Sequence, residues 1–68
     1  MDYYKRLEMA TLKIVERIKF ERKLKIAELE YTALTFGLKK KVLFEILDTL
    51  KRKGDILILK DTDEVEAA

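Results

Sequence analysis

The side chains best able to do chemistry in this chain of 68 residues are clustered lysines and arginines. One cluster, Lys39–Lys41, lies just before an apolar segment, and a second, at residues 51–53, lies at its end. Arg22, Lys23 and Lys25 form a third cluster earlier in the chain. Closely spaced cations bind anions, so the clusters predict a nucleic acid or an acidic protein surface as partner. The plain alternative is the solvated surface of ordinary helices.

The charge is distributed unevenly along the chain. The formal net charge is only +2, from 15 basic and 13 acidic residues. Four of the acids and none of the bases lie in residues 61–68. Residues 1–60 therefore hold 15 bases and 9 acids, a net charge of +6. This excess favours an anionic partner for the main part of the chain.

The composition argues against catalysis. Cysteine, histidine and serine are absent, which removes the ordinary nucleophile–base pairs, disulfides and thiolate zinc sites. The stretch DTDEVE, residues 61–66, begins like a calcium-binding loop but lacks the glycine and the later glutamate of such loops. A solvated acidic tail is the better interpretation. We therefore expect a protein that is not an enzyme and uses no metal or cofactor.

The composition also indicates in which environment the protein works. No apolar run approaches the roughly 18–20 residues that span a bilayer, and the N-terminus has no signal-peptide pattern. We expect a soluble cytoplasmic protein with no membrane partner. Asn, Gln, Cys, His and Trp are missing while Lys and Glu abound, a pattern typical of hyperthermophiles. Chance in a short sequence is the alternative.

Apolar periodicity predicts three helices. Residues 3–19 form the first, with one apolar face. That face consists of Tyr3, Leu7, Ala10, Thr11, Ile14 and Ile18. The second covers residues 26–36 and is closed by Gly37 at its C-terminus. The third covers residues 38–53 and is stopped by Gly54. Its apolar arc consists of Val42, Leu43, Ile46, Leu47 and Leu50.

Shorter segments predict strands. Residues 22–26 alternate charged and apolar side chains, as a half-buried strand does. Residues 55–59 are apolar and too short for a helix. Residues 64–68 are either a weak last strand or a frayed end. The order predicts an α+β, mainly helical fold: a winged helix-turn-helix with three helices and a small antiparallel sheet. Residues 1–68 would be one domain, with 61–68 as its acidic wing or tail.

The stretch KIAELEYTALTFGLKKKVLFEILDTLKRKGDIL resembles archaeal winged-helix domains. Its spacing is similar to that of the C-terminal winged helix of archaeal minichromosome-maintenance helicases and of many small archaeal regulators. The matching positions are Leu29, Ala33, Gly37, Leu38, Leu43, Ile46, Leu47, Leu50 and Gly54. They cover about half the chain, and they mark the fold rather than a function.

The resemblance implies that the third helix enters the DNA major groove and that the wing touches the DNA backbone or the minor groove. The candidate nucleic-acid contacts are Lys39, Lys40, Lys41, Lys51, Arg52, Lys53, Arg22, Lys23 and Lys25. Direct base readout relies on Arg, Asn and Gln, and this helix has neither amide and one arginine. Glu45, Asp48 and an acidic wing whose only base is Lys60 would repel phosphates. We therefore expect double-stranded DNA bound through phosphates with low sequence specificity, in transcription or replication, and a nucleoid-associated location.

The alternative function is a protein-interaction module, an accessory subunit of a replication or transcription complex. Phe44 falls on the outward face of the third helix, and Tyr31 and Leu34 form a second apolar row on the helix before it. Exposed apolar patches usually mark interfaces, although a middle helix can also bury two sides against its neighbours. Met9 and Leu12, on the polar side of the first helix, are candidate contacts of a homodimer, although scattered apolar residues are common on protein surfaces.

Overall fold

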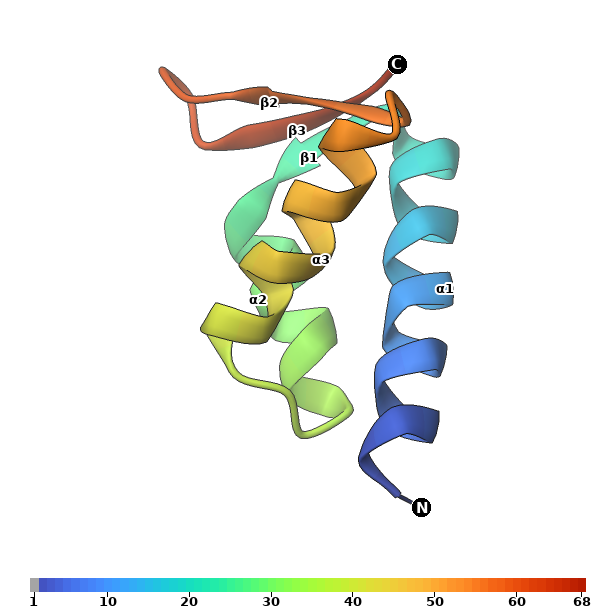
Figure 1. The fold of residues 1–68 in the computed structure, drawn as a ribbon. Coiled ribbons are helices and arrows are strands. Elements are labelled where there is room, and N and C mark those ends of the chain that lie inside the picture. The colour runs from blue at the N-terminus through green and yellow to red at the C-terminus, as the bar shows by residue number, and fades with distance from the viewer. Residues whose placement is uncertain (1) are drawn as a thin grey trace.

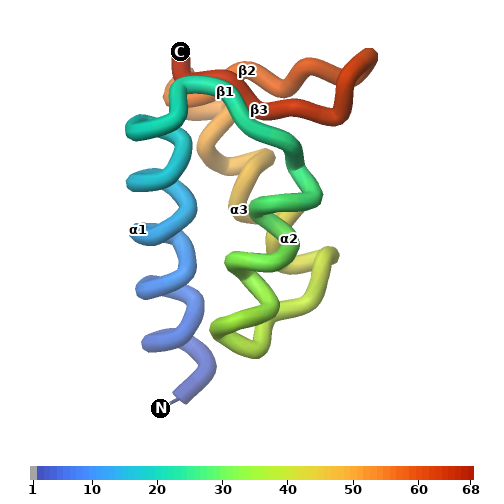
Figure 2. The backbone as a smooth tube through the Cα atoms, turned by 180° about the vertical axis from the view of Figure 1, so that it is seen from behind, coloured from blue at the N-terminus to red at the C-terminus, as the bar shows by residue number. Residues whose placement is uncertain are grey.

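The protein has three helices and a three-stranded antiparallel sheet, a winged-helix-like layout, in a computed structural model that describes residues 2–68 (Figure 1). The elements are α1 (Tyr3–Glu21), β1 (Lys23–Lys25), α2 (Ile26–Thr35), α3 (Lys40–Arg52), β2 (Ile56–Leu59) and β3 (Glu64–Ala67). This confirms the predicted fold class. Figures 1 and 2 both show the sheet lying across one end of the helices, with the β2–β3 hairpin projecting beyond them.

The first helix begins where an N-cap is available and ends without a sequence signal. The Asp2 carboxylate accepts a hydrogen bond from the Lys5 backbone N–H at 2.8 Å. Ala10, Ile14 and Ile18 are fully buried, as the periodicity predicts. The helix extends to Glu21, two residues beyond the predicted end. It closes at Arg22, whose φ of 68° lies in the region that non-glycine residues seldom adopt.

The turn between α2 and α3 depends on Gly37, as predicted. Its φ is 73°, and its N–H donates to Leu34 O at 2.8 Å. The next N–H, that of Leu38, donates to Ala33 O at 3.0 Å. These two bonds form a Schellman motif, and the side chain of Leu38 is buried in the core beside it. The motif ends α2 and directs the chain into α3.

The core side of α3 follows the predicted arc. Leu43, Ile46, Leu47 and Leu50 are buried, and Val42 is partly buried against them. Gly54, with φ 81°, ends this helix with the same pair of bonds, from Gly54 N–H to Lys51 O and from Asp55 N–H to Leu50 O. Because one side of α3 is anchored in the core, the opposite side faces solvent.

The last strand lies at the centre of the sheet. The strand order is β1-β3-β2, and β3 pairs antiparallel with both neighbours. Residues 64–67 therefore form a strand. The sequence alone allowed either a strand or a frayed end for this segment. Leu24, Val65 and Ile58 are aligned across the three strands on the face toward the core. The opposite face carries the row Lys23, Glu66 and Leu57.

We predict that Gly37→Ala destabilises the fold more than Gly54→Ala. Both glycines have positive φ, so each alanine adds strain of about 1–2 kcal/mol. A Cβ at Gly37 would also lie 2.8 Å from Arg6 Nη1, so the end of that side chain must shift and give up its hydrogen bond to Phe36 O, whereas a Cβ at Gly54 meets nothing within 4 Å. Urea unfolding followed by circular dichroism measures both free energies of unfolding.

The Arg6→Ala background is the control for this comparison. Arg6 Nη1 donates to Phe36 O at 3.4 Å, at the C-terminus of α2. If the clash with Arg6 causes the extra loss, the two glycine substitutions should cost the same once Arg6 is truncated. An unchanged difference in that background would contradict this explanation.

Candidate nucleic-acid interface

The outward side of α3 carries the predicted cations at both of its ends. All six basic residues from Lys39–Lys41 and Lys51–Lys53 are exposed. Lys51 and Arg52 lie in the last turn, where the helix dipole favours positive charge. The first turn contains lysines and no acid, which the dipole disfavours. Helix stability therefore does not explain the N-terminal cluster.

The distance between the two clusters along α3 is comparable to the width of the DNA major groove. Lys40 and Lys51 are eleven residues apart in one continuous helix. At a rise of 1.5 Å per residue their Cα atoms are separated by about 17 Å along the axis. The major groove of B-DNA is about 12 Å wide. A helix of this length lying in the groove can therefore bring its two ends to phosphates on opposite sides of it.

Several of these cations have no acidic partner among residues 2–68. Lys39, Lys41, Lys51 and Lys53 make no ion pair with any of residues 2–68. Lys40 is engaged on two sides. Its Nζ lies 3.4 Å from Glu30 Oε1 and 5.7 Å from the centroid of the Phe44 ring. Exposed pairs of this kind are weak, so an incoming phosphate could replace them.

The middle of the outward face is not basic. A shallow hollow there is lined by Lys40, Lys41, Phe44, Glu45 and Asp48. Phe44 is 42% exposed, as its position on the helix predicts. Arg52, the only arginine of α3, is hydrogen-bonded to Asp48 one turn earlier. The segment that would face base edges thus presents an aromatic ring and two carboxylates.

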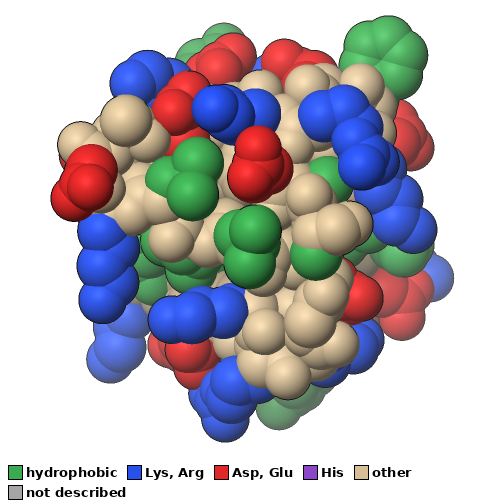
Figure 3. All heavy atoms as spheres, turned by 90° about the horizontal axis from the view of Figure 1, so that it is seen from above, with side chains coloured by type: hydrophobic (Ala, Val, Ile, Leu, Met, Phe, Trp, Pro, Cys, Tyr) green, Lys and Arg blue, Asp and Glu red, His purple; other side chains and the backbone are tan. Residues whose placement is uncertain are grey.

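The third cluster is separated from α3. Lys23 and Lys25 belong to β1, at the edge of the sheet opposite to β2, and α3 contacts β2. Lys25 Nζ donates to Thr62 O at 3.1 Å, in the β2–β3 turn. The structure therefore does not unite the cluster at Arg22, Lys23 and Lys25 with the cations of α3 on one face. Figure 3, a view onto the sheet end, shows basic, acidic and hydrophobic side chains interspersed.

The apolar candidates for an interface are exposed. Tyr31 is 72% exposed and Leu34 is 65% exposed on α2, so neither is buried against a neighbouring helix. Met9 and Leu12 are also exposed on α1. Sequence reasoning missed further exposed residues, Phe20 at 87%, Tyr4 at 80% and Leu57 at 52%, and it placed Tyr3, which is 43% exposed, on the core face of the first helix. Phe20 could have been found by extending α1 by two residues, because it then shares a helix side with Met9.

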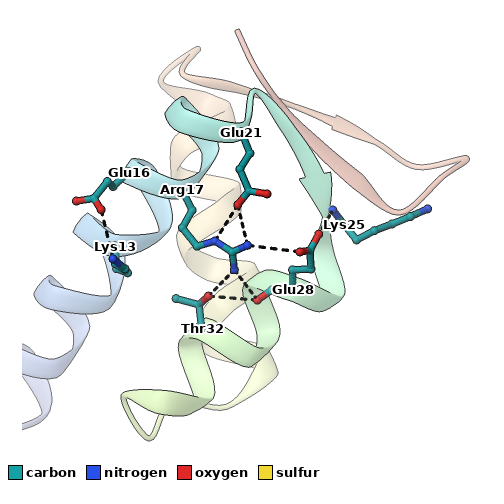
Figure 4. A network of polar contacts seen from close by, with 7 residues as sticks. All are labelled: Lys13, Glu16, Arg17, Glu21, Lys25, Glu28 and Thr32. Carbon is teal, nitrogen blue, oxygen red and sulfur yellow. Dashed lines mark hydrogen bonds and ion pairs between the residues drawn. The ribbon is translucent and has the colours of Figure 1, made fainter.

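Arg17, a basic residue of α1, stabilises the contact between α1 and α2. Arg17 in α1 donates from Nε and Nη2 to Glu21 Oε2 at 3.0 and 2.7 Å, and from Nη1 to Thr32 Oγ1 at 3.1 Å (Figure 4). Its Nη2 also lies 3.4 Å from Glu28 Oε1. The hydrogen bond with Glu21 raises the pKa of Arg17, and the charge of Glu28 adds to this. Arg17 therefore ties α1 to α2 and is not a free cation.

Comparison with family models, with curated proteins and with solved structures found no match to this chain. Residues 2–68 contain no group of three or more His, Cys, Asp or Glu side chains that could hold a metal ion. Within the same residues, no helix has the length and apolarity needed to cross a membrane.

We predict that Arg17→Lys lowers the free energy of unfolding by about 1 kcal/mol, because lysine keeps the charge but cannot make the forked bonds to Glu21 and Thr32. The control is Lys13→Ala, which removes only an exposed pair with Glu16 at 3.3 Å. That change should cost less than about 0.5 kcal/mol. Thermal unfolding of both variants measures the two effects. Equal losses would mean that Arg17 does not hold α1 against α2.

Proposed function

We propose that this protein binds duplex DNA through phosphate contacts made by α3, with low sequence specificity, as a nucleoid-associated protein of transcription or replication. The observation that carries the proposal is the pair of basic clusters at the two ends of α3, about 17 Å apart along the helix. Four of their cations lack an ion-pair partner among residues 2–68. Clustered, exposed and unpaired cations are the usual electrostatic footprint of a DNA-binding surface.

Low specificity follows from the middle of α3. Base edges are read mainly by Arg, Asn and Gln, and α3 has neither amide. The one apolar group there, Phe44, suits the methyl group of thymine, which would give a mild base preference. Carboxylates at Glu45 and Asp48 would repel phosphates but lie toward the groove floor in this arrangement. Affinity would therefore come mainly from counterion release.

The wing is unsuited to phosphate contact. The turn between β2 and β3 contains Asp61 and Asp63, both exposed, and Glu64 and Glu66 follow in β3. Lys60 is the only base of this hairpin. The proposal therefore assigns DNA binding to α3 alone and leaves the wing free for another task.

Binding to a labelled duplex, measured by fluorescence anisotropy at several salt concentrations, tests the proposal. We expect a Kd of about 10⁻⁴–10⁻⁶ M near physiological salt, with tighter binding at low salt. The double variant Lys41→Ala/Lys51→Ala removes one unpaired cation from each end of α3. If both contact phosphates, the slope of log K against log salt should fall by about 2.

The matched control is Lys5→Ala/Lys19→Ala, which removes the same charge from two exposed positions of α1. It should change the salt slope much less than the α3 variant. Equal effects of the two double variants would mean attraction by net charge and no α3 interface. Absence of binding at low salt would reject the proposal.

A second candidate, a subunit of a larger protein assembly, is supported by Tyr31 and Leu34, exposed side by side on α2. Large apolar side chains gathered on a surface often mark a protein interface. Phe44 adds a third exposed apolar side chain, on the outward side of α3. If this surface docks a partner, Phe44→Asp and Tyr31→Ser should each remove the same proteins from a co-purification out of the native host.

The control for that experiment is Leu12→Ser, a similar loss of exposed apolar surface on α1. Quantitative mass spectrometry of the co-purified proteins provides the measurement. If wild type and the Phe44 and Tyr31 variants recover the same partners, these residues form no interface. Retention of duplex binding by the Tyr31 variant would separate this candidate from DNA binding.

A further inference from the structure

The hydrogen-bonding pattern of the sheet leaves one apolar strand with unpaired backbone groups. The Ala68 N–H donates to Asp55 O at 3.1 Å, and the register pairs Leu57 with Glu66 and Leu59 with Glu64. Antiparallel partners alternate between hydrogen-bonded and non-hydrogen-bonded pairs. Residues 55, 57 and 59 therefore bond to β3. The N–H and C=O groups of the two residues between them, Ile56 and Ile58, point away from it.

The pairing on the other side of β3 agrees with this assignment. Ala67 N–H donates to Arg22 O at 2.7 Å, and Ile26 N–H donates to Asp63 O at 2.8 Å. These bonds place the odd-numbered residues of β3 in contact with β1 and its even-numbered residues in contact with β2. No turn, loop or side chain of residues 2–68 bonds the backbone of Ile56 or Ile58 on its outer side.

The two edges of the sheet differ in their protection. The edge strand β1 has three residues, two of them lysines, and the Glu28 carboxylate accepts from the Lys25 N–H at 3.4 Å. Charged residues and short length are common defences of an edge strand against further pairing. The opposite edge, β2, has the sequence ILIL with no charge, no proline and no bulge. Leu57 is 52% exposed in its middle.

We propose that β2 is a self-association edge, at which a second copy of this chain adds its own β2 antiparallel to form a continuous six-stranded sheet. In the register that joins Ile56 to Ile58 of the other copy, and Ile58 to Ile56, all four outward groups of each copy find a partner. This register places the two-fold axis at Leu57. The two Leu57 side chains then face each other as a non-hydrogen-bonded pair, the closer of the two arrangements.

The charges around β2 favour a second copy as the occupant. A strand without charge meets no repulsion from its own duplicate, and the two-fold arrangement makes the surface self-complementary. In this register Asp55 lies opposite Leu59 of the other copy, one position from Lys60 of that copy. No two like charges therefore lie opposite each other along the paired strands. The added strand covers Leu57, which the single chain leaves half exposed.

The interface is a single short strand from each copy, so we expect a weak, concentration-dependent dimer. Sedimentation equilibrium from about 10 µM to about 1 mM should show a shift from the 8.1 kDa monomer toward twice that mass. Leu57→Lys places two like charges opposite each other on the axis. That variant should weaken association at least tenfold and remain folded, because the side chain faces solvent in the single chain.

Leu12→Lys is the matched control, an exposed leucine changed in the same way on α1. It should associate like wild type. If Leu12→Lys abolishes the dimer and Leu57→Lys does not, self-association uses α1 and the proposal is wrong. A chain that stays monomeric to about 1 mM would also overturn it.

Amide hydrogen exchange locates the edge directly. The N–H groups of Ile56 and Ile58 should exchange fast at low concentration and become protected at high concentration. Those of Leu57 and Leu59 bond to β3 and should be protected at both. Protection of Ile56 and Ile58 that does not depend on concentration would contradict the proposal. None of these measurements involves DNA, so the outcome is independent of the proposed DNA binding.

Discussion

Anchoring of one side of α3 in the core is the constraint on which the rest of the molecule depends. Leu43, Ile46, Leu47 and Leu50 are buried, and they recur at the helical period. Because an α-helix is rigid, burying this arc also determines which residues face outward. The exposed lysines at both ends and Phe44 between them are a consequence of that packing. The candidate interface therefore needs no element beyond those that make the core.

The remaining elements hold α3 in place with few contacts, as a domain of this size must. A chain of about 60–70 residues buries a smaller share of its surface than a larger domain, so individual links matter. The Schellman turn at Gly37 sets the direction between α2 and α3. Arg17 bonds α1 to α2, and β3 joins β1 to β2 across the sheet. The last strand thus links the segment between α1 and α2 to the segment that follows α3.

Charge is distributed unevenly over the surface of the protein. The cations of α3 lie away from β1. The wing, which is the β2–β3 hairpin, is acidic and would repel phosphate groups. The uncharged edge strand of that hairpin, β2, is where a second copy is proposed to pair. In the proposed arrangement the sheet would serve assembly and α3 would bind DNA.

The periodicity of the sequence by itself determined the helices, the winged-helix-like order, the two glycine turns and the outward position of Phe44. These are local properties, since a helix face and a left-handed glycine depend on residues within a few positions. Only the tertiary structure decided that β3 lies between β1 and β2, that Arg17 bonds α2, and that Tyr31 and Leu34 remain exposed. Those outcomes depend on pairing between distant segments, for which short-range spacing contains no signal. The open edge at Ile56 and Ile58 belongs to the same class, because it exists only once the strand order is known.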